Sequence, residues 1–225
     1  MLDKIEQTRL NRWGLIATPF LLAFGFIGRT SDWPLSWIWL LLFSSLALLT
    51  QFGSDAYKLF LKPLGKGKLR YILLFVVLSF VVSTIAARLG NVLLNNHAVE
   101  NPIAQSLHSN TLLQNIYFFL TTWISLAGEE LTTAAVAFPL YHYLVKQIGG
   151  KQAFLLSSIL SALFFGSLHL TTYSWNWYQS LVVIGLTRIP FNYAWKKTDS
   201  LRGGIIAHTV YDYLIFFFVL LAGGH

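Results

Sequence analysis

The chain has 225 residues, of which 55% are hydrophobic and only 11% are charged, and its formal net charge is +7. A soluble domain carries about a quarter charged residues, so this composition excludes an ordinary water-soluble fold and indicates an integral membrane protein. The absence of cysteine excludes disulfides, thiol catalysis and cysteine-based metal sites.

Seven apolar stretches approach or exceed the length of about 20 residues that a membrane-spanning helix needs. They lie at residues 13–28, 33–50, 70–94, 113–145, 152–171, 175–195 and 202–222. The sequence therefore predicts an all-α fold, a polytopic transmembrane helix bundle of about seven spans. An eighth span or a re-entrant segment stays open. Because no polar linker separates two hydrophobic blocks, we expect one compact membrane domain.

The loops between these stretches alternate in charge. Lys and Arg collect in residues 1–12, 51–70, 146–151 and 196–202, whereas residues 95–112 and 172–178 contain neither. Since Lys and Arg favour the cytoplasmic side, we expect a multi-pass protein with its N-terminus in the cytoplasm. As a separate expectation, which the charge pattern does not establish, we take the membrane to be that of a bacterial cell. We attribute the positive charge to this topology and to anionic lipid head groups, and expect no nucleic acid partner.

Two adjacent carboxylates, Glu129 and Glu130, lie in the middle of the stretch NIYFFLTTWISLAGEELTTAAVAFPLYHYL. A charged side chain near the centre of a bilayer costs about 2.5–3.5 kcal/mol, so we expect the pair to face a wet cavity or ionic partners. A carboxylate in such a cavity is suited to activate water as a general base. The alternative is a helix end at the membrane interface, next to Gly128.

Two further apolar stretches contain ionisable side chains. His169 follows Phe165 by four residues, so one helical face holds both and the phenyl ring can shield the imidazole. His208 and Asp212 have the same spacing, and an Asp can fix the tautomer of a His. Each feature alone also fits a structural role, a hydrogen-bonded core histidine or an ion pair. Because three stretches bring ionisable groups into lipid, we expect them to meet, which requires strong helix tilt or a loop that dips into the membrane.

At these positions the chain resembles the CAAX protease and bacteriocin-processing family of intramembrane glutamic proteases, relatives of the type II CAAX prenyl endopeptidases. The family pattern is Glu-Glu-x-x-x-Arg, then Phe-x-x-x-His, then His-x-x-x-Asn or Asp. Here it reads EELTTA at 129–134, FGSLH at 165–169 and HTVYD at 208–212. The resemblance implies a protease-like core at residues 113–225 that follows accessory spans at residues 1–112.

The resemblance also implies roles for the individual residues. Glu129 and His169 would activate the attacking water, His208 and Asp212 would support the oxyanion, and Glu130 would assist. The implied function is an intramembrane endopeptidase that needs no cofactor or metal and acts on a peptide or lipid-modified peptide, such as a bacteriocin precursor. The alternatives are a bacteriocin-immunity or binding protein with weak or no activity, and a proton-coupled transporter. Two His and several carboxylates can also hold zinc, although the sequence has no His-Glu-x-x-His motif.

One position departs from the family pattern, because Ala134 stands where the motif has Arg. An Arg there would lie four residues after Glu130 and neutralise it on the same helical face. Arg188 is a candidate replacement from another stretch. The alternative is that Arg188 extends to the cytoplasmic interface beside Lys196 and Lys197.

Overall fold

The computed structural model describes residues 1–31 and 33–222, and this part of the chain is helical without a β-strand. The prediction of an all-α fold is confirmed. The helices are α1 (Leu2–Gln7), α2 (Arg12–Thr30), α3 (Ser36–Phe52), α4 (Ser54–Phe60), α5 (Leu69–Leu94), α6 (Pro102–Ser109), α7 (Leu112–Ile148), α8 (Gly150–Ser167), the π-helix η1 (Tyr178–Ile184), α9 (Gly185–Thr198) and α10 (Leu201–Ala222).

Three helices, α2, α5 and α10, are long and apolar enough to cross a membrane, and α3 is apolar but has 17 residues. A helical segment corresponds to each of the seven predicted stretches, but the number of spans stays a prediction. Large apolar side chains such as Phe20, Val92 and Leu113 are exposed. Such surfaces suit a lipid environment, where apolar side chains face hydrocarbon.

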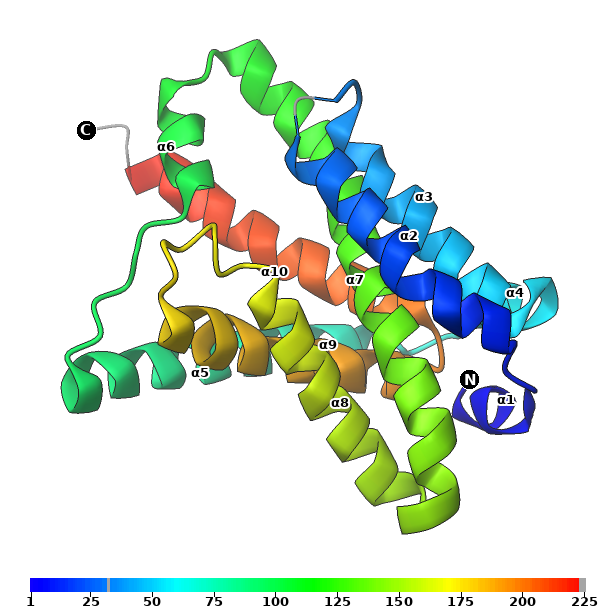
Figure 1. The fold of residues 1–225 in the computed structure, drawn as a ribbon. Helices are drawn as coiled ribbons and strands as arrows, with labels where there is room; N and C mark the ends of the chain where they lie inside the picture. Colours follow the sequence, from blue (N-terminus) through cyan, green and yellow to red (C-terminus); the bar gives the residue numbers. More distant parts are fainter. Residues whose placement is uncertain (32, 223–225) are drawn as a thin grey trace.

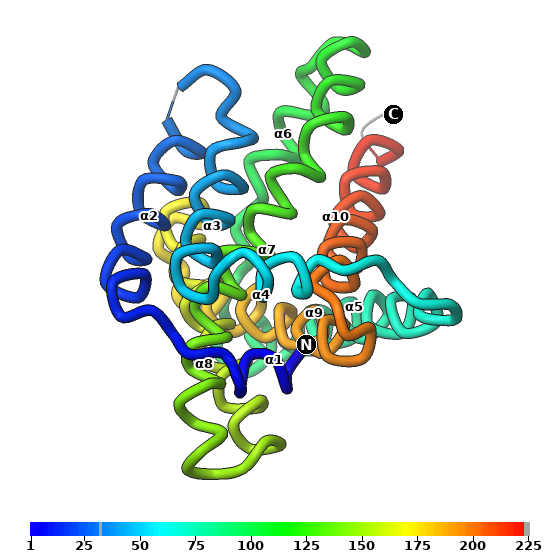
Figure 2. The backbone as a smooth tube through the Cα atoms, turned by 90° about the vertical axis from the view of Figure 1, so that its right-hand side faces the viewer, coloured from blue at the N-terminus to red at the C-terminus, as the bar shows by residue number. Residues whose placement is uncertain are grey.

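The helices cross at steep angles instead of forming a parallel bundle. In Figure 1, α2, α3 and α7 slope together through the molecule, whereas α5 and α9 lie across them. Figure 2 shows α2 beside α3 from another side, and α7 passing through the centre. The long helix α7 packs on α3, α8 and α10, and α9 packs on α5, α8 and α10. Strong tilt of this kind is one of the two conditions under which the predicted site residues can meet.

Helix α7 continues without interruption through Glu129 and Glu130. Gly128 does not end it. Instead, this glycine lets α3 approach closely, since a Cβ atom at position 128 would lie 2.6 Å from the backbone nitrogen of Leu41. The alternative of a helix end beside the two carboxylates is therefore wrong.

The chain after α8 departs from the predicted span at residues 152–171. Helix α8 ends at Ser167, so His169 lies in the turn formed by residues 168–175 rather than in a helix. The stretch predicted at 175–195 consists of η1 followed by α9. Gly166 allows η1 to pack closely on α8, because a Cβ atom there would lie 2.4 Å from the carbonyl oxygen of Ser180. The turn and the π-helix together direct His169 toward the centre of the molecule.

The turn between α9 and α10 is fastened by ionic contacts. Asp199 pairs with the amino group of Met1 and with Lys62, which follows α4. Partial burial raises the pKa of Asp199, but its hydrogen bonds and the positive charges of these two groups outweigh burial and hold it below its ordinary value. These contacts fix the start of α10, the helix that carries two of the predicted site residues.

Candidate active site

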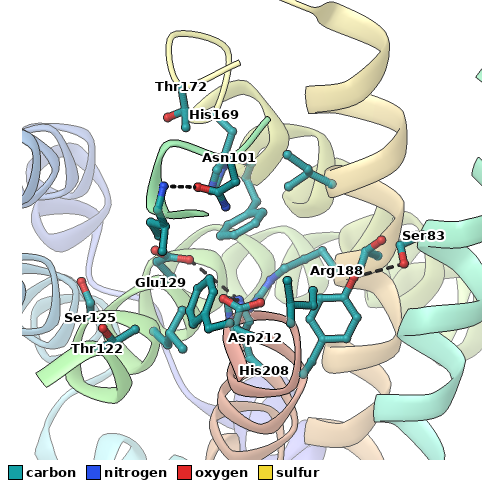
Figure 3. A pocket seen from close by; sticks show the side chains of 18 of the residues that line it. Ser83, Asn101, Thr122, Ser125, Glu129, His169, Thr172, Arg188, His208 and Asp212 are labelled. Atoms are coloured by element: carbon teal, nitrogen blue, oxygen red, sulfur yellow. Dashed lines mark hydrogen bonds and ion pairs between the residues drawn. The ribbon is translucent and has the colours of Figure 1, made fainter. Parts of the chain in front are cut away.

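The ionisable side chains predicted from separate stretches line one cavity of about 500 Å³. Glu129 comes from α7, His169 from the turn after α8, Arg188 from α9, and His208 and Asp212 from α10. Figure 3 shows Glu129 directed toward His208 and Asp212. The side chain of Arg188 extends toward the same group from α9. The sequence-based expectation that these groups share one site agrees with this geometry.

Glu130 lies behind the cavity wall and is fully buried. Its Oε1 atom forms an ion pair with Nη1 of Arg188 and accepts a hydrogen bond from Nδ1 of His208 at 2.9 Å. Its Oε2 atom accepts from Nε1 of Trp195 at 2.7 Å. Gly204 leaves room for this bond, since a Cβ atom there would lie 2.0 Å from Trp195 Nε1 and 2.6 Å from the carboxylate. Both oxygens of Glu130 are thus engaged.

Arg188 supplies the positive charge that Ala134 does not. Its side chain is only 1% exposed, so the alternative in which it extends to the cytoplasmic interface is wrong. The guanidinium lies over three aromatic rings, with its Cζ atom 4.9 Å from the centre of Phe165, 5.4 Å from Trp195 and 5.7 Å from Phe191. Cation–π contacts of this kind stabilise a desolvated cation. The Nε and Nη2 atoms have no hydrogen-bond partner among the described residues.

His208 joins the buried cluster to the cavity. Because a carboxylate only accepts hydrogen bonds, the contact of Nδ1 with Glu130 requires a proton on Nδ1. The other ring nitrogen, Nε2, lies 3.5 Å from Oδ2 of Asp212 and 3.9 Å from Oε2 of Glu129. Phe191 stacks on the imidazole with ring centres 4.8 Å apart. The ring is therefore held on one edge, while Nε2 faces the two carboxylates of the cavity.

His169 has a fixed tautomer. Its Nδ1 atom lies 3.0 Å from the carbonyl oxygen of Phe165, which can only accept, so Nδ1 carries a proton and Nε2 of the neutral ring has a free lone pair. The Phe165 ring centre lies 4.6 Å from this imidazole and 6.1 Å from that of His208. The ring of Phe165 thus lies against His169 as expected, but the two do not share a helical face, and the backbone carbonyl of Phe165 orients the imidazole.

Several residues of the cavity wall were not predicted from the sequence. Some of them come from the region before α7, among them Arg29 of α2, Ser83 of α5 and Asn101, which caps α6. Arg29 donates from Nε to Oγ of Ser125 on α7. Of these, only Arg29 carries a signal, a charge at the end of an apolar stretch. The region at 1–112 therefore contributes directly to the wall of the cavity.

No group of three or more His, Asp or Glu residues in the described part of the chain is arranged to hold a metal ion. The expectation that the site works without a metal or other cofactor stays a prediction.

The fold and the cavity together define a class of protein, a helical membrane protein whose ionisable side chains from several helices meet in one internal site. Within this class, the family model described as type II CAAX prenyl endopeptidase Rce1-like matches residues 111–214. The match includes every predicted acidic and imidazole residue of the site, and it confirms over this segment the resemblance to the CAAX protease family. No curated protein and no solved structure gives a significant match. The family is one of proteases, and its match together with the apolar helices indicates a membrane protein.

Proposed function

We propose that the protein is an intramembrane endopeptidase that hydrolyses a peptide bond with water activated by Glu129 and His169. One observation carries this proposal: the two adjacent glutamates lie in different surroundings. Glu129 is partly exposed to the cavity, with 19% of its side-chain surface accessible, whereas Glu130 is fully buried and paired. Only the former can reach a water molecule beside the free Nε2 of His169.

In the proposed reaction, Glu129 accepts a proton from water, and the water oxygen attacks the carbonyl carbon of the scissile peptide bond. The second O–H of the water donates to Nε2 of His169, which orients the water molecule. When the tetrahedral intermediate collapses, the C–N bond breaks and Glu129 gives the proton that it accepted to the leaving amine. General base catalysis of this kind contributes a factor of about 10²–10⁴ in rate.

His208 is the proposed donor to the oxyanion. Since its Nδ1 proton is held by Glu130, the donor must be a protonated Nε2, which faces the cavity. Asp212, at 3.5 Å from Nε2, stabilises the doubly protonated ring and thus acts through His208, because an ionised carboxylate cannot donate. Loss of one oxyanion donor costs a factor of about 10²–10³ in rate.

The substrate we propose is a membrane-associated peptide or lipid-modified peptide, such as a bacteriocin precursor. We further propose that residues 113–225 form the protease core, that residues 1–112 are accessory spans, and that the N-terminus and the basic loops face the cytoplasm of a bacterial cell and its anionic lipids. The alternative of an inactive immunity or binding protein depended on the missing motif Arg. Because Arg188 takes over the role of that counter-ion at Glu130, this alternative loses its main support.

Glu129→Gln and His169→Ala test the proposal. The purified variants are reconstituted in liposomes and incubated with a mixture of apolar peptides, and the products are identified by mass spectrometry. We expect both variants to cleave at least about 100-fold more slowly than the wild type without a change in Tm. Glu6→Gln, at an exposed carboxylate of α1, is the matched control and should cleave normally. If both site variants cleave at the wild-type rate, the catalytic assignment is wrong.

A further inference from the structure

A second cavity lies beside the candidate active site, between α2, α3, α7 and α8, with a volume of about 520 Å³ and a mostly apolar wall. We call it the apolar groove; Leu22, Phe26, Val136 and Phe164 are among its lining residues. A smaller cavity of about 120 Å³, which we call the connecting cavity, lies between the groove and the active site and shares lining residues with both.

The connection follows one face of α7. Glu129 lines both the active-site cavity and the connecting cavity, and Thr132 lines both the connecting cavity and the groove. Val136 and Pro139, further along the same helical face, line the groove itself. A ligand in the groove would therefore extend directly from the proposed catalytic carboxylate.

The apolar wall contains a buried hydrogen-bond acceptor, the Oε1 atom of Gln51. The side-chain Nε2 atom donates to the carbonyl oxygen of Ala135 at 2.9 Å and to Oγ1 of Thr18 at 2.7 Å. Because the carbonyl only accepts, these bonds fix the orientation of the amide. Oε1 is left without a partner in the described part of the chain, although Gln51 is only 1% exposed. The Oγ1 atom of Thr132 is likewise buried and has no hydrogen-bond partner among the described residues.

Pro139 explains why the amide of Gln51 is held at this wall, and a second proline, Pro19, lies on the opposite helix. Pro139 has no N–H to donate to Ala135 four residues earlier, and Gln51 bonds that carbonyl instead. Pro19 of α2 likewise removes the helical donor of Leu15, and both of these residues line the groove. The wall of the groove thus contains a buried acceptor, Oε1 of Gln51, that the described residues leave unpaired, and such a group is costly in apolar surroundings.

The apolar wall and the unpaired Oε1 atom of Gln51 together favour one class of ligand over another. A hydrocarbon chain would fill the groove but has no donor for Oε1 of Gln51. An extended apolar peptide has both the side chains that suit the wall and backbone N–H groups that suit the acceptor. The ten steps from Glu129 to Pro139 rise about 15 Å along α7, which corresponds to about four or five residues of extended peptide.

We infer that the apolar groove binds a segment of four or five apolar residues on one side of the scissile bond, in extended conformation, with one backbone N–H donating to Gln51. The link between the groove and peptide cleavage rests on the proposed function. Binding of a peptide to the groove can be measured whether or not the protein cleaves that peptide. Gln51 is a binding residue in this scheme, and α2 and α3, which lie outside the matched family segment 111–214, supply half of the groove.

The test uses the full chain carrying Glu129→Gln in nanodiscs, so that bound peptide is not cleaved. The probes are fluorescein-labelled decapeptides with a central segment of Ala, Val, Leu and Phe between terminal lysines, and empty nanodiscs correct for partitioning. The tightest binder is remade with each backbone N–H in turn replaced by an ester oxygen, which removes one donor and keeps the shape. We expect one such replacement to weaken binding about 5- to 10-fold, and this loss to disappear in Gln51→Met.

A second variant keeps the test valid if Gln51→Met fails to fold. Ala23→Trp fills the groove from its exposed side and should weaken binding at least tenfold. Phe20→Trp, on the same helix but outside the groove, is the matched control and should change binding less than twofold.

The inference is overturned if no peptide binds above the empty-nanodisc level, if every ester analogue binds equally well, or if Ala23→Trp has no effect. It is also overturned if Ala23→Trp displaces a fluorescent acyl-chain lipid but leaves peptide binding unchanged, because the occupant is then a lipid. Groove-dependent binding to a protein whose wild type cleaves no peptide would refute only the proposed function. If Ala23→Trp cleaves peptide with an unchanged kcat/KM, the role of the groove in substrate binding is refuted, but the proposed function is not.

Discussion

Replacing Arg188 by Met would show whether this residue neutralises the buried carboxylate of Glu130. Met keeps most of the length and apolar volume of the side chain but removes the charge. Both partners are fully buried, and removing one member of a buried ion pair costs about 3–5 kcal/mol, because the other charge is left without compensation. For a chain of this size, each kcal/mol corresponds to about 2–4 °C in Tm, so we expect Tm to fall by roughly 6–20 °C.

The measurement is thermal unfolding of the purified protein in detergent, followed by the fluorescence of its eight tryptophans, which include Trp195 beside the ion pair. Arg202→Met, at an exposed arginine in the first turn of α10, is the matched control and should shift the stability by no more than about 0.5 kcal/mol. The double variant Arg188→Met with Glu130→Gln removes both charges and should recover most of the lost stability. A single Arg188→Met variant that unfolds within about 1 °C of the wild type would refute the reasoning.

Three further predictions concern the surroundings of the site. Gly204→Ala should lower the stability by about 1–3 kcal/mol and the cleavage rate at least tenfold, because its Cβ atom would collide with Trp195 and Glu130; unchanged unfolding and kcat would contradict the packing described. Incubation with a zinc chelator should leave the rate of peptide cleavage unchanged, whereas loss of activity that zinc restores would contradict a metal-free mechanism. Because the pKa of Asp199 lies below its ordinary value, its contribution to stability is present above about pH 4 and is lost as the pH falls further. Asp199→Asn should therefore lower Tm at pH 7, with a difference that shrinks toward pH 3, and equal Tm values at pH 7 would contradict this.

The meeting of Glu129, His169 and His208 could be predicted because lipid imposes a strong constraint. Ionisable groups in an apolar stretch need partners or water, and three such stretches in one chain favour a common site. The local position of His169 could not be predicted in the same way. The apolar run continues through Ser167 to His169 with no proline to end the helix, so the sequence favours a helix where the structure has a turn.

The roles of Arg188 and Gln51 depend on packing that sequence periodicity does not determine. Arg188 lies near a group of basic residues at the end of α9, so a position at the interface is equally consistent with its sequence context. Gln51 is a neutral polar residue near the end of α3, a helix that also contains Ser44, Ser45 and Thr50, so nothing in its sequence context marks it. Its role becomes visible only because Pro139, far away in the sequence, frees the carbonyl of Ala135 that Gln51 binds.

The counter-ion from α9 also accounts for the different positions of the two glutamates. Successive residues of an α-helix point about 100° apart, so Glu129 and Glu130 cannot both face the cavity. Glu130, which is buried behind the cavity wall, needs a fixed positive charge nearby, and Arg188 provides it. The same carboxylate holds His208 by Nδ1, which leaves Nε2 directed at the cavity. The buried carboxylate of Glu130 thus requires a nearby cation, but this cation need not be an arginine at position 134. Ala134 is fully buried in a cluster with Phe138 and Trp195, and Trp195 itself donates to the carboxylate of Glu130, so the packing around position 134 suits a small side chain.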